Sequence, residues 1–159
     1  MNAYKNNQGF SLIELLLVVA IIGIISAIAV PNLLASKRAA NESSAIASLR
    51  SISSAEATYQ ATAGVGLYGS LSDLNTAGLI DATLSNSTIA APKSGYAFAA
   101  TADANNPNAQ YLTTAATAVP TGVTASGTRN FAADASGRMT YGTASQTHMT
   151  SNNGTPVGN

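Results

Sequence analysis

A nearly unbroken apolar stretch from Phe10 to Val30 constrains this chain more than any other feature, because it carries a single carboxylate, Glu14, close to its start. A charged side chain in hydrocarbon costs several kcal/mol, so an acid inside a membrane segment indicates a function and a partner elsewhere. From Leu15 to Ser36 the chain runs for 22 residues without a formal charge. About 20 apolar residues are enough to cross the hydrocarbon core of a bilayer. The stretch therefore predicts a membrane-spanning helix with an acid near one end.

A short polar leader, residues 1–9, precedes the stretch and ends in Gly9-Phe10, with Glu14 fifth when counted from Phe10. This arrangement resembles the processing site of type IV prepilins and pseudopilins. The resemblance implies that a membrane peptidase cuts after Gly9 and N-methylates Phe10, the new amino terminus. It also implies that Glu14 pairs with the N-terminal amine of a neighbouring subunit and sets the subunit register. A carboxylate and an ammonium buried together cost far less than either ion alone.

Other interpretations of the same stretch remain open beside the resemblance. A signal peptide would use Lys5 as its basic region, Leu15 to Ser26 as its apolar region and Ala27-Ile28-Ala29 as its cut. Glu14 inside the run and Pro31 two places past that cut disfavour this interpretation. A single-span anchor that keeps its leader fits the length alone. The core helix of a soluble domain fits poorly, because the run is too long and too uniformly apolar.

The predicted fold is α+β and type IV pilin-like: a long N-terminal α-helix packed on a small antiparallel β-sheet. Residues 1–9 form the leader and 10–31 the transmembrane or filament-core helix. Residues 32–63 continue this helix as an amphipathic segment, because apolar residues recur there at three- and four-residue spacings. Residues 64–142 form a small globular domain. Residues 143–159 are polar and lack periodicity, which predicts a flexible tail.

Two residues inside the predicted helix weaken it locally. Pro31 lacks a backbone donor and clashes with the preceding turn, so it is expected to kink the helix or open a gap in its hydrogen bonding. Gly23 loosens the same region. Membrane helices carry both residue types more often than soluble helices do, which is one explanation for them. The other, implied by the resemblance, is that residues 23–31 stretch when subunits leave the lipid and pack into a filament.

The sequence of the second half of the chain predicts a short helix and several strands. Ser70, with an acid three residues later and Gly78 at the end, indicates a short helix over 70–78. Alternating apolar residues and turn signals predict strands. These strands are expected at 95–101, 109–119, 129–134 and 138–141.

Composition argues against several classes of function. Charged residues make up 9% of the chain, the formal net charge is zero and cysteine is absent. This leaves no strong nucleic-acid signature, no disulfide framework and no thiolate metal site. The lone histidine, His148, is expected to be solvated in the tail. The turn at 103–108 offers oxygen ligands but lacks the dense carboxylates of a good calcium site. We expect no cofactor, no metal and no enzymatic activity.

Taken with the resemblance, these features predict a structural subunit of a type IV pilus for adhesion, twitching motility or DNA uptake. A type II secretion pseudopilin is the alternative within the family, and a bitopic membrane protein with an external binding domain is the alternative outside it. Lys5 places the leader on the cytoplasmic face, so the subunit waits in the inner membrane and then joins an extracellular pilus. The implied partners are identical subunits, a prepilin peptidase that is also the N-methyltransferase, a platform protein and an assembly ATPase.

Overall fold

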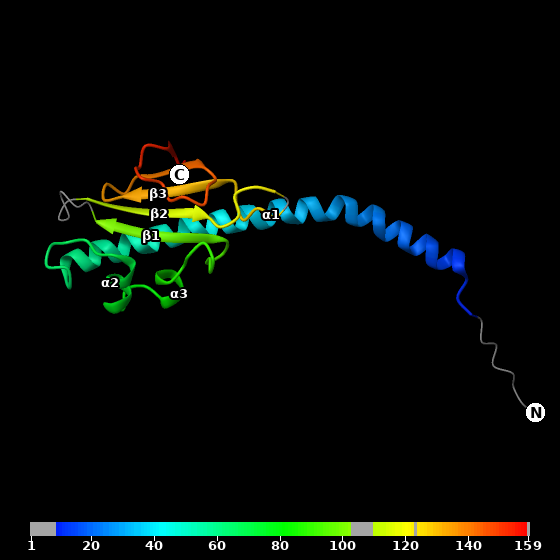
Figure 1. Cartoon of the computed structure of the whole chain (residues 1–159), viewed down its shortest axis with the longest axis horizontal. Coiled ribbons are helices and arrows are strands. Elements are labelled where there is room, and N and C mark those ends of the chain that lie inside the picture. The colour runs from blue at the N-terminus through cyan, green and yellow to red at the C-terminus, as the bar shows by residue number, and fades with distance from the viewer. Residues whose placement is uncertain (1–8, 103–109, 123, 159) are drawn as a thin grey trace, which may run out of the picture. The chain divides into compact units, whose positions relative to one another are not determined.

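The computed structural model describes residues 9–102, 110–122 and 124–158, which divide into two compact units, Met1–Ala35 and Ser36–Asn159. The predicted leader up to residue 8 and the turn at 103–108 lie outside the described residues. One helix, α1 (Leu12–Ala61), runs through both units. The other elements, all in the second unit, are α2 (Leu71–Thr76), α3 (Ala82–Ser85), β1 (Tyr96–Ala102), β2 (Tyr111–Thr117), β3 (Arg129–Asp134), β4 (Met139–Thr143) and β5 (Thr155–Pro156) (Figure 1).

The second half of α1 packs on the sheet and forms the core of the second unit. Leu49 and Ile52 of α1 are fully buried, and they lie in one cluster with Tyr96 and Phe131 of the sheet. The other buried members of this cluster are Ala45, Ala55, Leu71, Leu74, Leu84, Phe98 and Ala115. Three- and four-residue spacing along α1 puts its members on one helical face. The α+β fold class predicted from the sequence is thereby confirmed.

The five strands form an antiparallel sheet in the order β1-β2-β3-β4-β5. Their register aligns large side chains on the face toward α1, since Phe98 lies opposite Ala115, and Phe131 lies opposite both Ala115 and Tyr141. The turn between β3 and β4 contains Gly137 at φ 75°, a conformation that glycine adopts without strain. Strands β1 to β4 match the four predicted segments to within two residues at each end, and β2 is two residues shorter than predicted at both ends.

The short helix α2 begins as the sequence indicates. The Ser70 hydroxyl accepts a hydrogen bond from the Asp73 N–H at 3.3 Å, and the Ser70 N–H donates to Asp73 Oδ2 at 2.8 Å. Such a reciprocal pair satisfies two backbone donors at the helix start. The Ser70 N–H and hydroxyl lower the pKa of Asp73, because both donate to its carboxylate.

Residues 143–159 differ from the expectation of a tail without regular structure. Strand β5 pairs with β4, and between them residues 144–153 form a segment that we name the C-terminal strap. The Asn130 amide donates to the carbonyls of Ser145 at 2.9 Å and Thr147 at 3.0 Å. His148 is partly buried and its Nδ1 lies 2.8 Å from Thr114 Oγ1. Burial lowers its pKa, so the prediction of a solvated imidazole is wrong.

Polar side chains on neighbouring strands explain why the strap takes this position. Asn152 is 7% exposed. Its amide donates to Asp134 Oδ2 at 2.7 Å and to the Arg138 carbonyl at 2.8 Å, and its Oδ1 accepts from the Thr140 hydroxyl. Hydrogen bonds made by polar side chains need no apolar periodicity, so the sequence pattern gives no sign of them.

Removal of the Asn152 side chain tests this attachment. We expect Asn152→Ala to lower the free energy of unfolding by about 2 kcal/mol, because the buried Thr140 hydroxyl and the Asp134 carboxylate lose a partner. The measurement is urea unfolding of the full chain in detergent. Asn153→Ala, at an exposed neighbouring position, is the control and is expected to change stability by less than about 0.5 kcal/mol. Equal effects of the two substitutions would contradict the role of Asn152.

Candidate functional site

The first unit is an apolar helix that its own chain does not cover. Leu12 is 80% exposed, Ile13 74% and Phe10 75%. Large apolar side chains remain exposed along the whole helix, namely Leu15, Leu16, Leu17, Val18, Val19, Ile21, Ile22, Ile24, Ile25, Ile28, Val30 and Leu33. Within the part of the chain that the structure describes, α1 is the one helix long and apolar enough to cross a membrane. Apolar surface of this extent indicates contact with a membrane or with other protein chains.

The residues of the predicted processing site lie at the start of α1. Gly9 and Phe10 precede the helix. The Ser11 carbonyl accepts hydrogen bonds from the N–H groups of Glu14 at 3.1 Å and Leu15 at 3.2 Å, which closes the first turn. Glu14 is therefore in the first turn, where the helix dipole favours a negative charge. Glu14 follows Phe10, the residue after the predicted cut, by four positions.

Gly23 and Pro31 both lie inside α1, whose helical assignment runs through them without a break. Pro31 has no N–H, so the carbonyl of Ala27 lacks its normal donor four residues later. A Cβ placed on Gly23 would meet no atom within 4 Å. Packing within this chain therefore does not require glycine there, and the predicted role of residues 23–31 in stretching stays a prediction.

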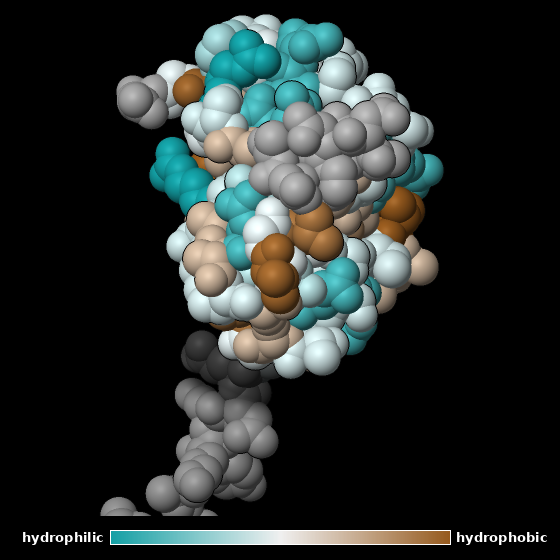
Figure 2. All heavy atoms as spheres, turned by 90° about the vertical axis from the view of Figure 1, so that its left-hand side faces the viewer, coloured by the Kyte–Doolittle hydropathy of each residue, from teal (hydrophilic) through white to brown (hydrophobic). Residues whose placement is uncertain are grey.

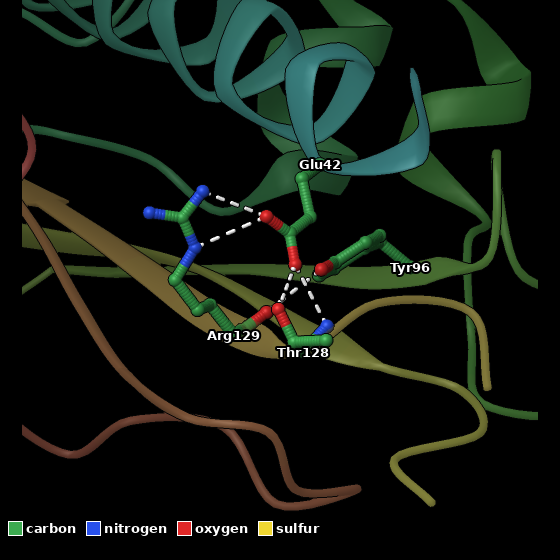
Figure 3. A network of polar contacts seen from close by, with 4 residues as sticks. All are labelled: Glu42, Tyr96, Thr128 and Arg129. Atoms are coloured by element: carbon green, nitrogen blue, oxygen red, sulfur yellow. Dashed lines mark hydrogen bonds and ion pairs between the residues drawn. The ribbon is translucent and has the colours of Figure 1, made fainter. Parts of the chain in front are cut away.

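A second polar site, in the middle of α1, is not visible in the sequence. Glu42 is 7% exposed, and its carboxylate accepts four hydrogen bonds (Figure 3). Its Oε1 accepts from the Thr128 N–H at 2.7 Å and the Thr128 hydroxyl at 2.6 Å. Its Oε2 accepts from Arg129 Nε at 3.0 Å and Nη2 at 2.7 Å. These bonds fix α1 to the start of β3.

The surroundings of this carboxylate hold it in the charged form. Burial raises the pKa of Glu42, but the hydrogen bonds from Thr128 and Arg129 and the charge of Arg129 outweigh burial, so the pKa lies below its ordinary value. The Arg129 guanidinium also lies over the rings of Tyr141 at 4.8 Å and Phe131 at 5.5 Å. The Tyr96 hydroxyl donates to the Arg129 carbonyl at 2.7 Å. The site joins one helix and three strands, which indicates a structural role.

The described residues contain no group of three or more His, Cys, Asp or Glu side chains that could hold a metal ion. The possible oxygen ligands at 103–108 lie outside the described part of the chain.

Comparison with known proteins identifies the first unit. The family described as "Prokaryotic N-terminal methylation motif" matches residues 4–30, which include Gly9, Phe10 and Glu14. The first unit therefore carries the motif of this family. The matched motif is a site of modification, not a catalytic domain. A methylation motif followed by an apolar helix fits a protein held in the inner membrane and then transferred to an extracellular pilus.

Two relatives of this chain are named as type IV pilus proteins. The "Type IV wide pilus major component PilA4" of Thermus thermophilus is 45% identical over 56 residues, which cover 35% of this chain and 43% of that protein. The "Type IV major pilin protein PilA" of Myxococcus xanthus is 43% identical over 53 residues, which cover 33% of this chain and 24% of that protein. The match thus spans less than half the length of each relative. No solved structure matches the chain.

The Glu42 site gives a prediction for stability. Arg129→Met removes the cation and leaves a buried carboxylate with fewer donors. Because the Arg129 side chain is 39% exposed, we expect a loss of about 2 kcal/mol, less than for a fully buried pair. Arg50→Met, at an exposed position of α1, is the control.

The effect of Arg129→Met is expected to depend on pH. Since the pKa of Glu42 is lowered in the folded state, the contribution of Glu42 to stability is present above the ordinary value of 4.5 and is lost as pH falls below it. Unfolding of both variants between pH 3 and pH 7 measures this, and a pH-independent difference would contradict it.

Proposed function

We propose that this chain is a structural subunit of a type IV pilus. The observation that carries the proposal is a methylation motif placed directly before an apolar helix that the rest of the chain leaves uncovered. The subunit is cut between Gly9 and Phe10, held in the inner membrane by residues 10–31 and then extracted into a filament. A single helix serves in both places, because lipid and neighbouring helices can each cover the same apolar surface.

The length of the apolar segment supports the membrane stage. The 22 uncharged residues from Leu15 to Ser36 extend about 33 Å as an α-helix. The hydrocarbon core of a bilayer is about 30 Å thick. Glu14 then lies at the cytoplasmic boundary, next to the new amino terminus, and Lys37 follows at the opposite boundary.

The filament stage depends on contact between different faces of identical chains. Such a heterologous interface closes into a ring only if the rotation between neighbouring subunits brings the last subunit back to the first. Otherwise its repetition gives an open fibre. Apolar contacts along residues 12–25 supply cohesion. Glu14 pairs with the methylated amine of Phe10 in the next subunit and sets the register. The further partners are a prepilin peptidase with N-methyltransferase activity, a platform protein and an assembly ATPase.

We favour the role of a pilus subunit for this chain over that of a type II secretion pseudopilin. Both relatives are named as major components of a pilus, which supports this choice. Adhesion, twitching motility and DNA uptake all remain within the proposal. A bitopic protein that keeps its leader is the alternative in which no filament forms.

The mass of the native protein tests the processing step. We expect the purified chain to begin at Phe10 and to carry one N-terminal methyl group, as measured by intact mass spectrometry. Gly9→Val is expected to leave uncut precursor in the membrane, because the side chain blocks the peptidase. A native protein that begins at Met1 would support the bitopic alternative, and one that begins near Val30 would support ordinary signal cleavage.

Substitution of Glu14 tests the register step separately. We expect Glu14→Ala to insert into the membrane at the normal level and to give at least about tenfold fewer sheared surface filaments, since the amine of the neighbouring subunit is left unpaired. Ser26→Ala, in the same apolar helix, is the control and should assemble normally. Filament yield is measured by electron microscopy and immunoblotting. Normal yield from Glu14→Ala would show that the carboxylate does not set register, even if cleavage occurs as expected.

A further inference from the structure

A second carboxyl on α1 is buried without the donors that surround Glu42. Glu56 is fully buried. Its Oε2 accepts one hydrogen bond, from the Gly69 N–H at 3.0 Å. Its Oε1 is also buried and has no hydrogen-bond partner among the residues that the structure describes. A charged carboxylate in such a place loses its hydration and gains little in return, so the neutral form is favoured.

The segment that Glu56 contacts is the loop of residues 62–70 between α1 and α2, which we name the α1–α2 loop. The loop is tightly folded, because a Cβ on Gly64 would lie 2.2 Å from the Leu67 carbonyl oxygen. Three of its amides bond to carbonyls at the end of α1. The N–H groups of Thr62 and Gly64 donate to the Tyr59 carbonyl at 3.1 and 2.7 Å, and the Gly66 N–H donates to the Gln60 carbonyl at 2.9 Å. Glu56 is the side chain that holds its far end, at Gly69.

The tip of the loop has an unfavourable backbone conformation at Val65. Val65 has φ 49°, in the left-handed region that a β-branched residue rarely adopts. A residue held there costs on the order of 1–3 kcal/mol and persists only when its surroundings enforce it. Val65 is also 89% exposed and Leu67 44%. The end of the second unit that carries the loop faces the viewer in Figure 2, where apolar side chains stand among polar ones.

The charged and titratable groups around Glu56 do not favour ionisation. Burial raises its pKa to about 7, the Gly69 N–H opposes this shift, and the negative charge of Asp73 on α2 adds to it. Tyr111 on β2 also faces Glu56, and burial together with the charge of Glu56 raises the pKa of this phenol. Neither neighbour supplies a positive charge.

We propose that Glu56 is a proton-controlled latch for the α1–α2 loop: the neutral carboxyl keeps Gly69 docked, and the carboxylate releases the loop so that water can reach the charge. Release frees Gly69 from α1 and changes how the exposed side chains of Val65 and Leu67 are presented. The latch is a property of the single chain and does not depend on filament formation.

The direction of the pH effect follows from proton binding. The docked state holds its proton up to about pH 7, whereas a solvated carboxyl loses it near the ordinary value of 4.5. Between these values the docked state binds more protons, so docking weakens as pH rises through this window and is constant above it. Glu42 provides an internal comparison, because its lowered pKa keeps it ionised throughout the same window.

Hydrogen exchange of the full chain in detergent micelles tests the latch. After correction for the intrinsic pH dependence of exchange, we expect the opening equilibrium at the Gly69 amide to rise about fortyfold between pH 5 and pH 7, since the pKa of the docked carboxyl is about 7 and that of a solvated one 4.5. The Thr128 amide, bonded to Glu42, should stay constant. Glu56→Gln should remove the rise at Gly69 while leaving Thr128 unchanged.

Two further measurements make the outcome decisive. Asp73→Asn removes the repelling charge and should lower the pKa of Glu56 in the docked state. The opening equilibrium at the Gly69 amide should then stop rising at a lower pH. The ¹³C chemical shift of the Glu56 carboxyl in the unmodified chain reports its titration without any substitution. A Glu56 titration near the ordinary value of 4.5, or a rise at Gly69 that persists in Glu56→Gln, would overturn the proposal.

Discussion

The apolar surface of the first unit must be covered by something other than its own chain, and the rest of the structure can be understood from that requirement. The second unit has a core of its own, built from one face of α1 and the sheet. The large apolar side chains of the first unit take no part in this core, so their surface is left for contact with lipid or with other chains. Proteins rarely expose so much continuous apolar surface without such a partner.

Along α1, three carboxylates show how the surroundings decide what an acid does. Glu42 meets four donors and one cation, so it stays charged and fixes the helix to β3. Glu56 meets one donor and a repelling acid, so it favours the neutral form. Glu14 lies at the uncovered end, and in the proposed filament its donor comes from another molecule. Glutamate therefore fixes α1 to β3 at one position, holds the α1–α2 loop as the proposed latch at another and sets the proposed subunit register at the third.

The sequence predicts the features that depend on local pattern. Apolar spacing predicted the faces of α1, Ser70 and Asp73 predicted the start of α2, and alternation predicted β1 to β4. It did not predict contacts between distant polar residues. Glu42 and Thr128 are 86 positions apart, and a polar side chain gives no periodic sign of a distant partner. The ordered strap was not predicted for the same reason, because Asn130 and Asn152 hold it through hydrogen bonds and not through an apolar face.

Apolar contact alone cannot give the proposed filament a unique arrangement. Hydrophobic attraction is non-directional and proportional to buried area, and the surface of residues 12–30 is lined with similar Leu, Ile and Val side chains. Two such helices that slide along each other bury nearly the same area at several offsets. A single carboxylate changes this, because an offset that leaves it unpaired costs several kcal/mol in a medium without water. Cohesion then comes from many interchangeable contacts, whereas position comes from one. An acid at the start of the helix is well placed for this task, since in the proposed filament its cation is the amine that cleavage after Gly9 would create.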